Sequence, residues 1–127
     1  MIGYVTLGTS DLERSGMFYD AMAAALGTSR KMEWPGGIAW GDPQGPGLGV
    51  IRPANGEAPS PGNGCMVGFR ANSKAHVEAL HALALANGGS CEGPPGYRGD
   101  AFYVAYFRDP DGNKLNAHFW DLSARPD

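Results

Sequence analysis

The stretch YFRDPDGNKLNAHF, residues 106–119, decides the fold. Its centre, DPDG at 109–112, is a turn signal between two runs rich in aromatic and apolar residues, so the sequence predicts a β-hairpin here. In the second run, polar and apolar residues alternate as Lys114, Leu115, Asn116, Ala117, His118 and Phe119. Successive side chains of a strand point to opposite faces. One face of the hairpin is therefore apolar, and the other is polar.

The same plan occurs earlier in the chain. A related turn, DPQG at 42–45, also separates two strand-like runs. The order strand, helix, strand, strand, Asp-Pro turn, strand occurs twice, which predicts a duplicated βαβββ module. We expect one α+β domain over residues 1–127, with modules at about 1–53 and 64–120. The alternative is an ordinary α+β domain in which two Asp-Pro turns coincide.

Each half has one helix-forming segment. Residues 10–27 combine apolar residues at helical spacing with Ser10 and Glu13 in the S-x-x-E pattern, which predicts a capping box at the start of a helix. Residues 72–89 show the same spacing and begin with Asn and Ser, either of which suits the N-cap position. Glycines close to the end of both segments predict helix stops.

Alternation divides the strand residues between two faces of the predicted sheet. We expect Val5, Leu7, Val67, Phe69 and Phe107 to lie under the helices. The opposite face carries aromatic and polar residues, which are Tyr4, Thr6, Arg70, Phe102, Tyr106, Lys114, Asn116 and His118. A curved mixed sheet of eight strands, with helices on its outer face, would close around these residues as an open cup. Such a lining is typical of a small-molecule pocket.

Composition limits the class of partner. The chain has 127 residues, an apolar fraction of 43% and a formal net charge of −3, as expected of one globular domain. The ten Lys and Arg residues are scattered, which argues against binding to nucleic acid or to an anionic membrane. No apolar run is long enough for a membrane span. Without a secretory signal pattern, the two cysteines indicate reduced thiols in a cytoplasmic protein.

These features together resemble the vicinal oxygen chelate superfamily, which includes glyoxalases, extradiol dioxygenases, and bleomycin- and fosfomycin-resistance proteins. The resemblance rests on YVTLGTSDLERSGMFYDAMAAALG at 4–27 and on the C-terminal hairpin, and it covers nearly the whole chain. It implies paired βαβββ modules that form a cup, a ligand site inside the cup and frequent homodimers. The superfamily's strand order also implies that Cys65 and Cys91 lie at opposite edges of one module and form no disulfide.

The resemblance also draws attention to a metal site. In the metal-dependent members, His or Gln begins each module's first strand, and Glu or another ligand lies in each module's last strand. The matching positions here are Tyr4, Gly49, Met66 and Asn116. Divalent cations of this kind need imidazole, carboxylate or thiolate ligands, which none of these residues supplies. We therefore predict no cofactor, and expect a divalent metal only at a displaced site.

Other polar residues allow either a functional or an ordinary structural interpretation. His118 is either a catalytic general base near neutral pH, or an arm of a displaced metal site, or simply a histidine at the rim. Arg70 and Lys114 either hold a carboxylate or phosphate group of a ligand or are ordinary exposed charges. His76 and His81 are five residues apart, which does not place two imidazoles on one helix face, so we expect surface residues.

Three hypotheses about function follow. The first is a metal-free small-molecule binding protein of the glyoxalase and bleomycin-resistance type, used for sequestration or sensing. The second is a lyase, isomerase or dioxygenase-like enzyme that uses a displaced metal or acid/base chemistry centred on His118. The third is an interaction module whose cup is filled by its own side chains. The fold alone does not choose among them, because it hosts unrelated chemistries.

Overall fold

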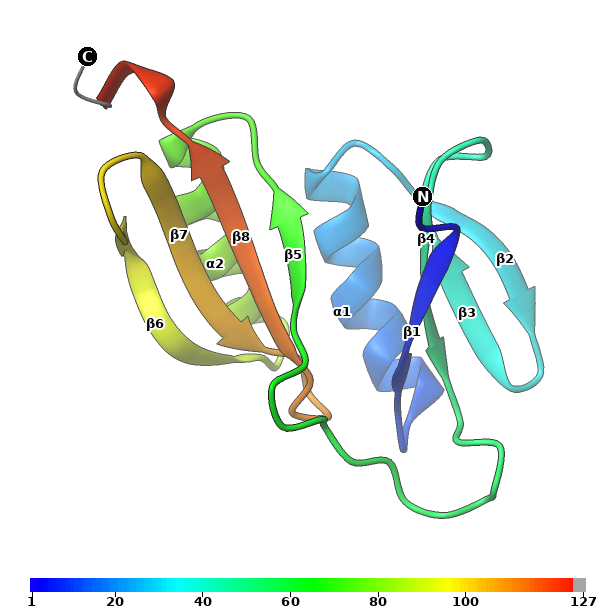
Figure 1. Ribbon diagram of the computed structural model, residues 1–127. Helices are drawn as coiled ribbons and strands as arrows, with labels where there is room; N and C mark the ends of the chain where they lie inside the picture. The colour runs from blue at the N-terminus through cyan, green and yellow to red at the C-terminus, as the bar shows by residue number, and fades with distance from the viewer. Residues whose placement is uncertain (125–127) are drawn as a thin grey trace.

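A computed structural model describes residues 1–124 of the chain (Figure 1). The elements are β1 (Tyr4–Gly8), α1 (Leu12–Ala25), β2 (Arg30–Trp34), β3 (Gly37–Trp40), β4 (Gly47–Ile51), β5 (Val67–Arg70), α2 (Lys74–Ala86), β6 (Ser90–Tyr97), β7 (Phe102–Arg108), β8 (Lys114–Trp120) and the short 3-10 helix η1 (Leu122–Ala124). The strand orders are β1-β4-β3-β2 and β5-β8-β7-β6. The two halves thus have one topology, which confirms the predicted pair of βαβββ modules.

The eight strands pair as two sheets of four. In each sheet the module's first and last strands are parallel and the other pairs are antiparallel. Within residues 1–124 no backbone ladder joins the sheets, so the continuous eight-stranded sheet that we expected does not form inside one chain. In the view of Figure 1, α1 appears in the gap between β5 and β1.

The core lies where the helices meet the sheets. Helix α2 packs against β6, β7 and β8, while α1 packs against β3, β4 and α2. Phe18, Leu80, Phe107 and Leu115 are fully buried there, and the other helix-facing residues that we predicted, apart from Val5, pack against the same cluster. No helix within residues 1–124 is long and apolar enough to span a membrane.

The start of α1 differs from the prediction. Its N-cap is Asp11, whose side chain accepts a hydrogen bond from the backbone N–H of Arg14, so the capping box built on Ser10 and Glu13 is wrong. The reason is a tertiary contact, because the backbone N–H and the hydroxyl of Ser10 donate to the carboxylate of Asp111 instead. In α2 the N-cap is Ser73, one of the two residues proposed.

Strand β6 is longer than its sequence suggested. Only residues 91–93 showed strand character, but the strand runs over Ser90–Tyr97 and includes Pro94 and Pro95. It lies at the edge of its sheet and its register shifts twice, and such an edge tolerates proline. The two cysteines are free and exposed, which agrees with the predicted absence of a disulfide.

The DPDG turn does more than close a hairpin, because it also joins the two modules. The carboxylate of Asp109 is 3% exposed and accepts a 2.7 Å hydrogen bond from the hydroxyl of Tyr19 on α1. It also accepts from the backbone N–H groups of Asp111 and Asn113 and from the Asn113 amide. The Asn113 amide in turn donates to the carbonyl of Gly8 at the end of β1. The second module's turn is thus bonded to the first module's helix and strand.

Asp111 completes this junction at the first turn of α1. Its carboxylate accepts from the hydroxyls of Thr9 and Ser15 at 2.6 and 3.0 Å. The guanidinium of Arg14 donates to the same carboxylate at 2.8 Å. A negative charge at the N-terminus of a helix is also favoured by the helix dipole. The turn therefore holds α1 through its side chains, which a hairpin signal does not reveal.

Acid should weaken this junction. Burial alone would raise the pKa of Asp111, but hydrogen bonds from Thr9, Ser10 and Ser15 outweigh it and the pKa is lowered. A lowered pKa gives stability that is fully present above the unfolded value of about 3.9 and is lost as pH falls through the folded value. We expect Asp111→Asn to unfold more easily at pH 7 by about 1–2 kcal/mol. Its denaturant midpoint should also fall less than that of the parent between about pH 5 and pH 2. Parallel acid dependence in the two proteins would contradict this prediction.

Candidate ligand-binding site

Strand β8 places Asn116 and His118 on the face of its sheet that looks away from α2. Asn116 is 4% exposed, and its amide nitrogen donates to the sulfur of Met66 at 3.5 Å. The amide oxygen therefore faces His118, whose Nδ1 lies 2.9 Å away. An amide oxygen only accepts, so Nδ1 carries the hydrogen and Nε2 keeps a free electron pair.

The environment of His118 keeps its imidazole neutral. Burial lowers its pKa, and the positive charge of Arg70 lowers it further. Arg70 is the neighbour of His118 in the register of β5 and β8. Because the ordinary pKa of histidine is about 6.5, a lowered value leaves the ring uncharged at pH 7. His118 is thus a fixed, neutral hydrogen-bond acceptor.

Aromatic rings stand beside this histidine. The rings of Phe102 and His118 are 5.5 Å apart and inclined by 30°. Trp120, which the sequence analysis did not single out, lies with its ring 4.5 Å from that of Phe102. Flat surfaces of this kind suit stacking against a planar molecule.

Tyr106 forms a second aromatic position on this face, opposite Asn116 in the register of β7 and β8. The ammonium of Lys114 lies 5.4 Å from the centre of its ring, and the guanidinium of Arg98 lies 5.8 Å from it. Both cations are within the distance at which a positive charge is attracted to an aromatic face. The polar end of the site is therefore positively charged.

Gly68 leaves room for the pair of Asn116 and His118. A Cβ atom on Gly68 would lie 2.9 Å from the Asn116 amide oxygen and 3.2 Å from the His118 ring. Real side chains essentially never approach at the first of these distances. A glycine is needed at this point of β5 because of close approach.

Most of the predicted ligand-binding residues share this face, which we call the β8 face. It consists of Arg70, Phe102, Tyr106, Lys114, Asn116 and His118 on β5, β7 and β8. Tyr4 and Thr6 lie on β1 in the other sheet, where Tyr4 is 75% exposed. Thr6, Met66 and Lys114 together line a small cavity of about 180 Å³. One chain therefore supplies the β8 face, while Tyr4 lies apart from it.

Comparison with known proteins assigns the chain to a family. The model of the Glyoxalase/Bleomycin resistance protein/Dioxygenase superfamily matches residues 1–117. The chain belongs to this superfamily. The family resemblance and the fold that the sequence indicated are thereby confirmed.

Solved structures of the superfamily support the assignment. A glyoxalase/bleomycin resistance protein from Albidiferax ferrireducens T118 is 41% identical, with 99% of both chains covered and a TM-score of 0.86. A glyoxalase-related enzyme from Fulvimarina pelagi is 25% identical over 94% of this chain and 87% of that chain, with a TM-score of 0.77. A lactoylglutathione lyase from Agrobacterium tumefaciens, at 21% identity, 94% and 92% coverage and a TM-score of 0.67, shares the fold. A search of curated proteins finds no match.

The superfamily's metal does not fit the residues that this chain offers. Gly49 has no side chain, and Tyr4 offers a phenol, which is not among the usual ligands of such cations. The Asn116 amide is already bonded to Met66 and His118. Within residues 1–124, no group of three or more His, Cys, Asp or Glu side chains gathers as metal ligands would. The four matching positions, Tyr4, Gly49, Met66 and Asn116, therefore do not offer the ligand set that the superfamily's metal needs.

The helix histidines are not the plain surface residues that we expected. The Nε2 of His76 lies 2.8 Å from the carbonyl oxygen of Ala25 at the end of α1. The Nε2 of His81 lies 3.2 Å from the sulfur of Cys91 on β6. Both histidines therefore join α2 to neighbouring elements, and neither approaches the β8 face.

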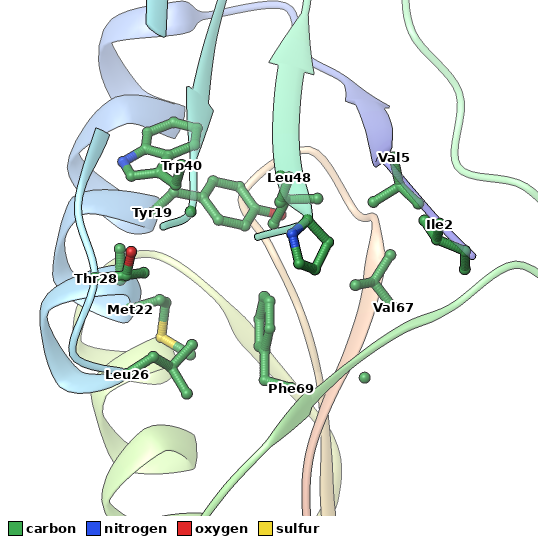
Figure 2. Close-up of a pocket in the computed structure, with 15 residues that line it drawn as sticks. Ile2, Val5, Tyr19, Met22, Leu26, Thr28, Trp40, Leu48, Val67 and Phe69 are labelled. Atoms are coloured by element: carbon green, nitrogen blue, oxygen red, sulfur yellow. The ribbon is translucent and has the colours of Figure 1, made fainter. Parts of the chain in front are cut away.

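A larger cavity lies elsewhere, between α1, the pair β1 and β4, and β5. Its volume is about 360 Å³. Figure 2 shows its main lining residues, which are Ile2, Val5, Tyr19, Met22, Leu26, Thr28, Trp40, Leu48, Val67 and Phe69. Sequence reasoning placed Val5, Val67 and Phe69 of this set under the helices, as core. Helical and strand periodicity show that a residue faces inward but not whether the space beyond it is filled, so the pattern held no signal for a cavity.

Proposed function

We propose that this member of the superfamily binds a small planar aromatic molecule with an anionic group on the β8 face, without the superfamily's divalent cation. The hydrogen bond between Asn116 and His118 carries the proposal. An amide stands where the metal-dependent members have a carboxylate, and it fixes a neutral imidazole beside Phe102. A site that is already ordered loses less entropy when a ligand binds.

The charge around the face supports an anionic ligand. The positive charge of Arg70 on β5 contributes to the lowered pKa of His118. The cationic groups of Lys114 and Arg98 lie close to the ring of Tyr106. Within residues 1–124, neither Arg70 nor Lys114 takes part in an ion pair. A carboxylate or phosphate group of the ligand would supply the missing partner.

Calorimetry with benzoate, 1-naphthoate and indole-3-acetate tests the proposal. We expect at least one of them to bind, and Arg70→Ala to weaken that binding about tenfold, the equivalent of one charge-assisted hydrogen bond. Arg52→Ala is the matched control, because the Arg52 guanidinium donates to the Pro35 carbonyl at the other sheet, away from the β8 face. Binding should persist in EDTA, and elemental analysis should find no stoichiometric metal. Equal affinity in the Arg70→Ala variant, or binding that requires a metal, would refute the proposal.

The binding unit that we propose is a homodimer. Each chain holds its two sheets apart, and Tyr4, Met66 and Trp120 are exposed at 75, 47 and 57%. Exposed apolar side chains of this size favour an interface. In a dimer, Tyr4 and Thr6 of one chain would cover the β8 face of the other. If so, mixing Tyr4→Ala and His118→Ala chains should restore part of the binding that each variant lacks.

The two free thiols support a proposal about where in the cell the protein is located. Cys65 and Cys91 are both exposed and free, and exposed free thiols persist in reducing compartments. We therefore extend the proposal to a cytoplasmic protein, which fractionation of the cells that express it would test.

A second candidate function is acid/base catalysis, as in a lyase, isomerase or dioxygenase-like relative. One observation favours it, namely that His118 is held neutral with Nε2 as a free acceptor. A general base needs both properties. If the bound compound is turned over, His118→Ala should abolish turnover while retaining the fold. Unchanged turnover in this variant would remove His118 from the chemistry.

A further inference from the structure

The cavity of about 360 Å³ lies behind β5, on the opposite side of that strand from the β8 face. Val67 and Phe69 point into the cavity, as Figure 2 shows, while Gly68 between them opens towards Asn116 and His118. One strand therefore separates two different environments. Three of the cavity's lining residues, Met22, Tyr19 and Trp40, are 1%, 2% and 3% exposed and belong to the packed core.

The side chains that line the cavity keep their polar atoms occupied elsewhere. The three polar side chains donate outwards, Tyr19 to Asp109 at 2.7 Å, Trp40 to Asp20 at 2.9 Å and Thr28 to Asp42 at 2.7 Å. The remaining lining residues have no polar side-chain atom other than the sulfur of Met22. A ligand would therefore meet carbon and sulfur, and no free side-chain donor.

Two backbone N–H groups at the cavity are paired as well. The N–H of Gly41 donates to the carbonyl of Ser29, and the N–H of Gly47 donates to that of Gly3. A sugar, an anion or a peptide segment would lose its hydrogen bonds to water here without replacement, at a cost of about 1–3 kcal/mol for each polar group. This disfavours a partner chain as the occupant, because its backbone N–H and C=O groups would be unpaired.

The volume indicates the size of an apolar occupant. An apolar cavity of about 150 Å³ in another protein holds a benzene molecule. The present cavity has about twice that volume, enough for two fused rings. The polar side chains of the lining are already hydrogen-bonded, and the volume suits two fused rings. We therefore propose that this cavity is a second binding site, which takes a neutral apolar ring compound about as large as naphthalene.

Fluorescence of naphthalene, a neutral probe of the proposed size, tests the site. The probe should bind and brighten, and Val67→Phe and Leu26→Phe, which fill the cavity from opposite walls, should each weaken binding by about tenfold or more. Leu83→Phe is the matched control, since Leu83 packs against the core from α2 and does not line the cavity. It should leave the affinity unchanged. Circular dichroism of each variant would show that the fold is retained.

Two further variants distinguish binding in this cavity from binding on the β8 face. His118→Ala should weaken the binding of the aromatic carboxylates but not of the neutral probe, and Val67→Ala should keep or improve probe binding. The inference is overturned if the probe does not bind, if neither cavity-filling variant weakens it, or if His118→Ala abolishes it. Failure of the carboxylates to bind would refute only the function proposed for the β8 face.

Discussion

Asp109→Ala is expected to lower the free energy of unfolding by about 3–5 kcal/mol, because several buried donors would each lose their acceptor at a cost of about 1–3 kcal/mol. The carboxylate is almost completely buried, and it accepts from Tyr19 and from two backbone N–H groups of its own turn. Its loss would leave these donors buried without partners. Urea unfolding followed by circular dichroism measures the change.

The repeat supplies a matched control. Asp42 occupies the same position in the first module's DPQG turn, but it is exposed and its carboxylate accepts from the hydroxyl of Thr28. Asp42→Ala should therefore cost less than about 1 kcal/mol. The loss of stability in Asp109→Asn should lie between those of Asp109→Ala and Asp42→Ala, because the oxygen of an amide still accepts hydrogen bonds while its nitrogen does not. Equal losses for Asp109→Ala and Asp42→Ala would show that the turn does not join the modules.

The two turns show which features of the structure could be predicted from the sequence and which could not. The hairpin at 106–119, its two faces and the repeated βαβββ order were all predictable, because they depend on local patterns of turn residues and alternation. The bond from Asp109 to Tyr19 spans 90 positions, and no local pattern encodes such a contact. For the same reason the cap of α1 moved to Asp11, since the rest of the fold occupied Ser10.

The candidate site was likewise predictable only in part. Alternation placed Asn116, His118 and Tyr106 on one face, and the structure has them there. Their relation to Tyr4 depended on whether the two sheets join within a chain, which strand patterns do not determine. The cavity behind β5 could not be predicted either, since the sequence placed Val67 and Phe69 under the helices as ordinary core residues. Packing defects belong to the assembled molecule and not to any single segment.

Gly68→Ala is the second change with a large expected effect, because Gly68 is where β5 approaches the Asn116 and His118 pair. The added Cβ would lie 2.9 Å from the Asn116 amide oxygen, so that amide must turn away from the His118 Nδ1. We expect a loss of about 1–3 kcal/mol in stability, as for other overpacked sites. We also expect an altered tautomer ratio at His118, because its Nδ1–H loses its acceptor. Nitrogen chemical shifts of the imidazole, measured by NMR, report this ratio directly.

Gly49→Ala provides the comparison on the other sheet. A Cβ on Gly49 would meet its nearest atom, the methyl group of Thr6, at 3.4 Å, which a small shift of that side chain relieves. We expect Gly49→Ala to leave the His118 signals unchanged. Asn116→Ala should reproduce the tautomer change of Gly68→Ala without adding a clash at β5. If the imidazole signals of Gly68→Ala matched the parent's, Asn116 would not be the group that orients His118, and the ordered site on the β8 face would lose its physical basis.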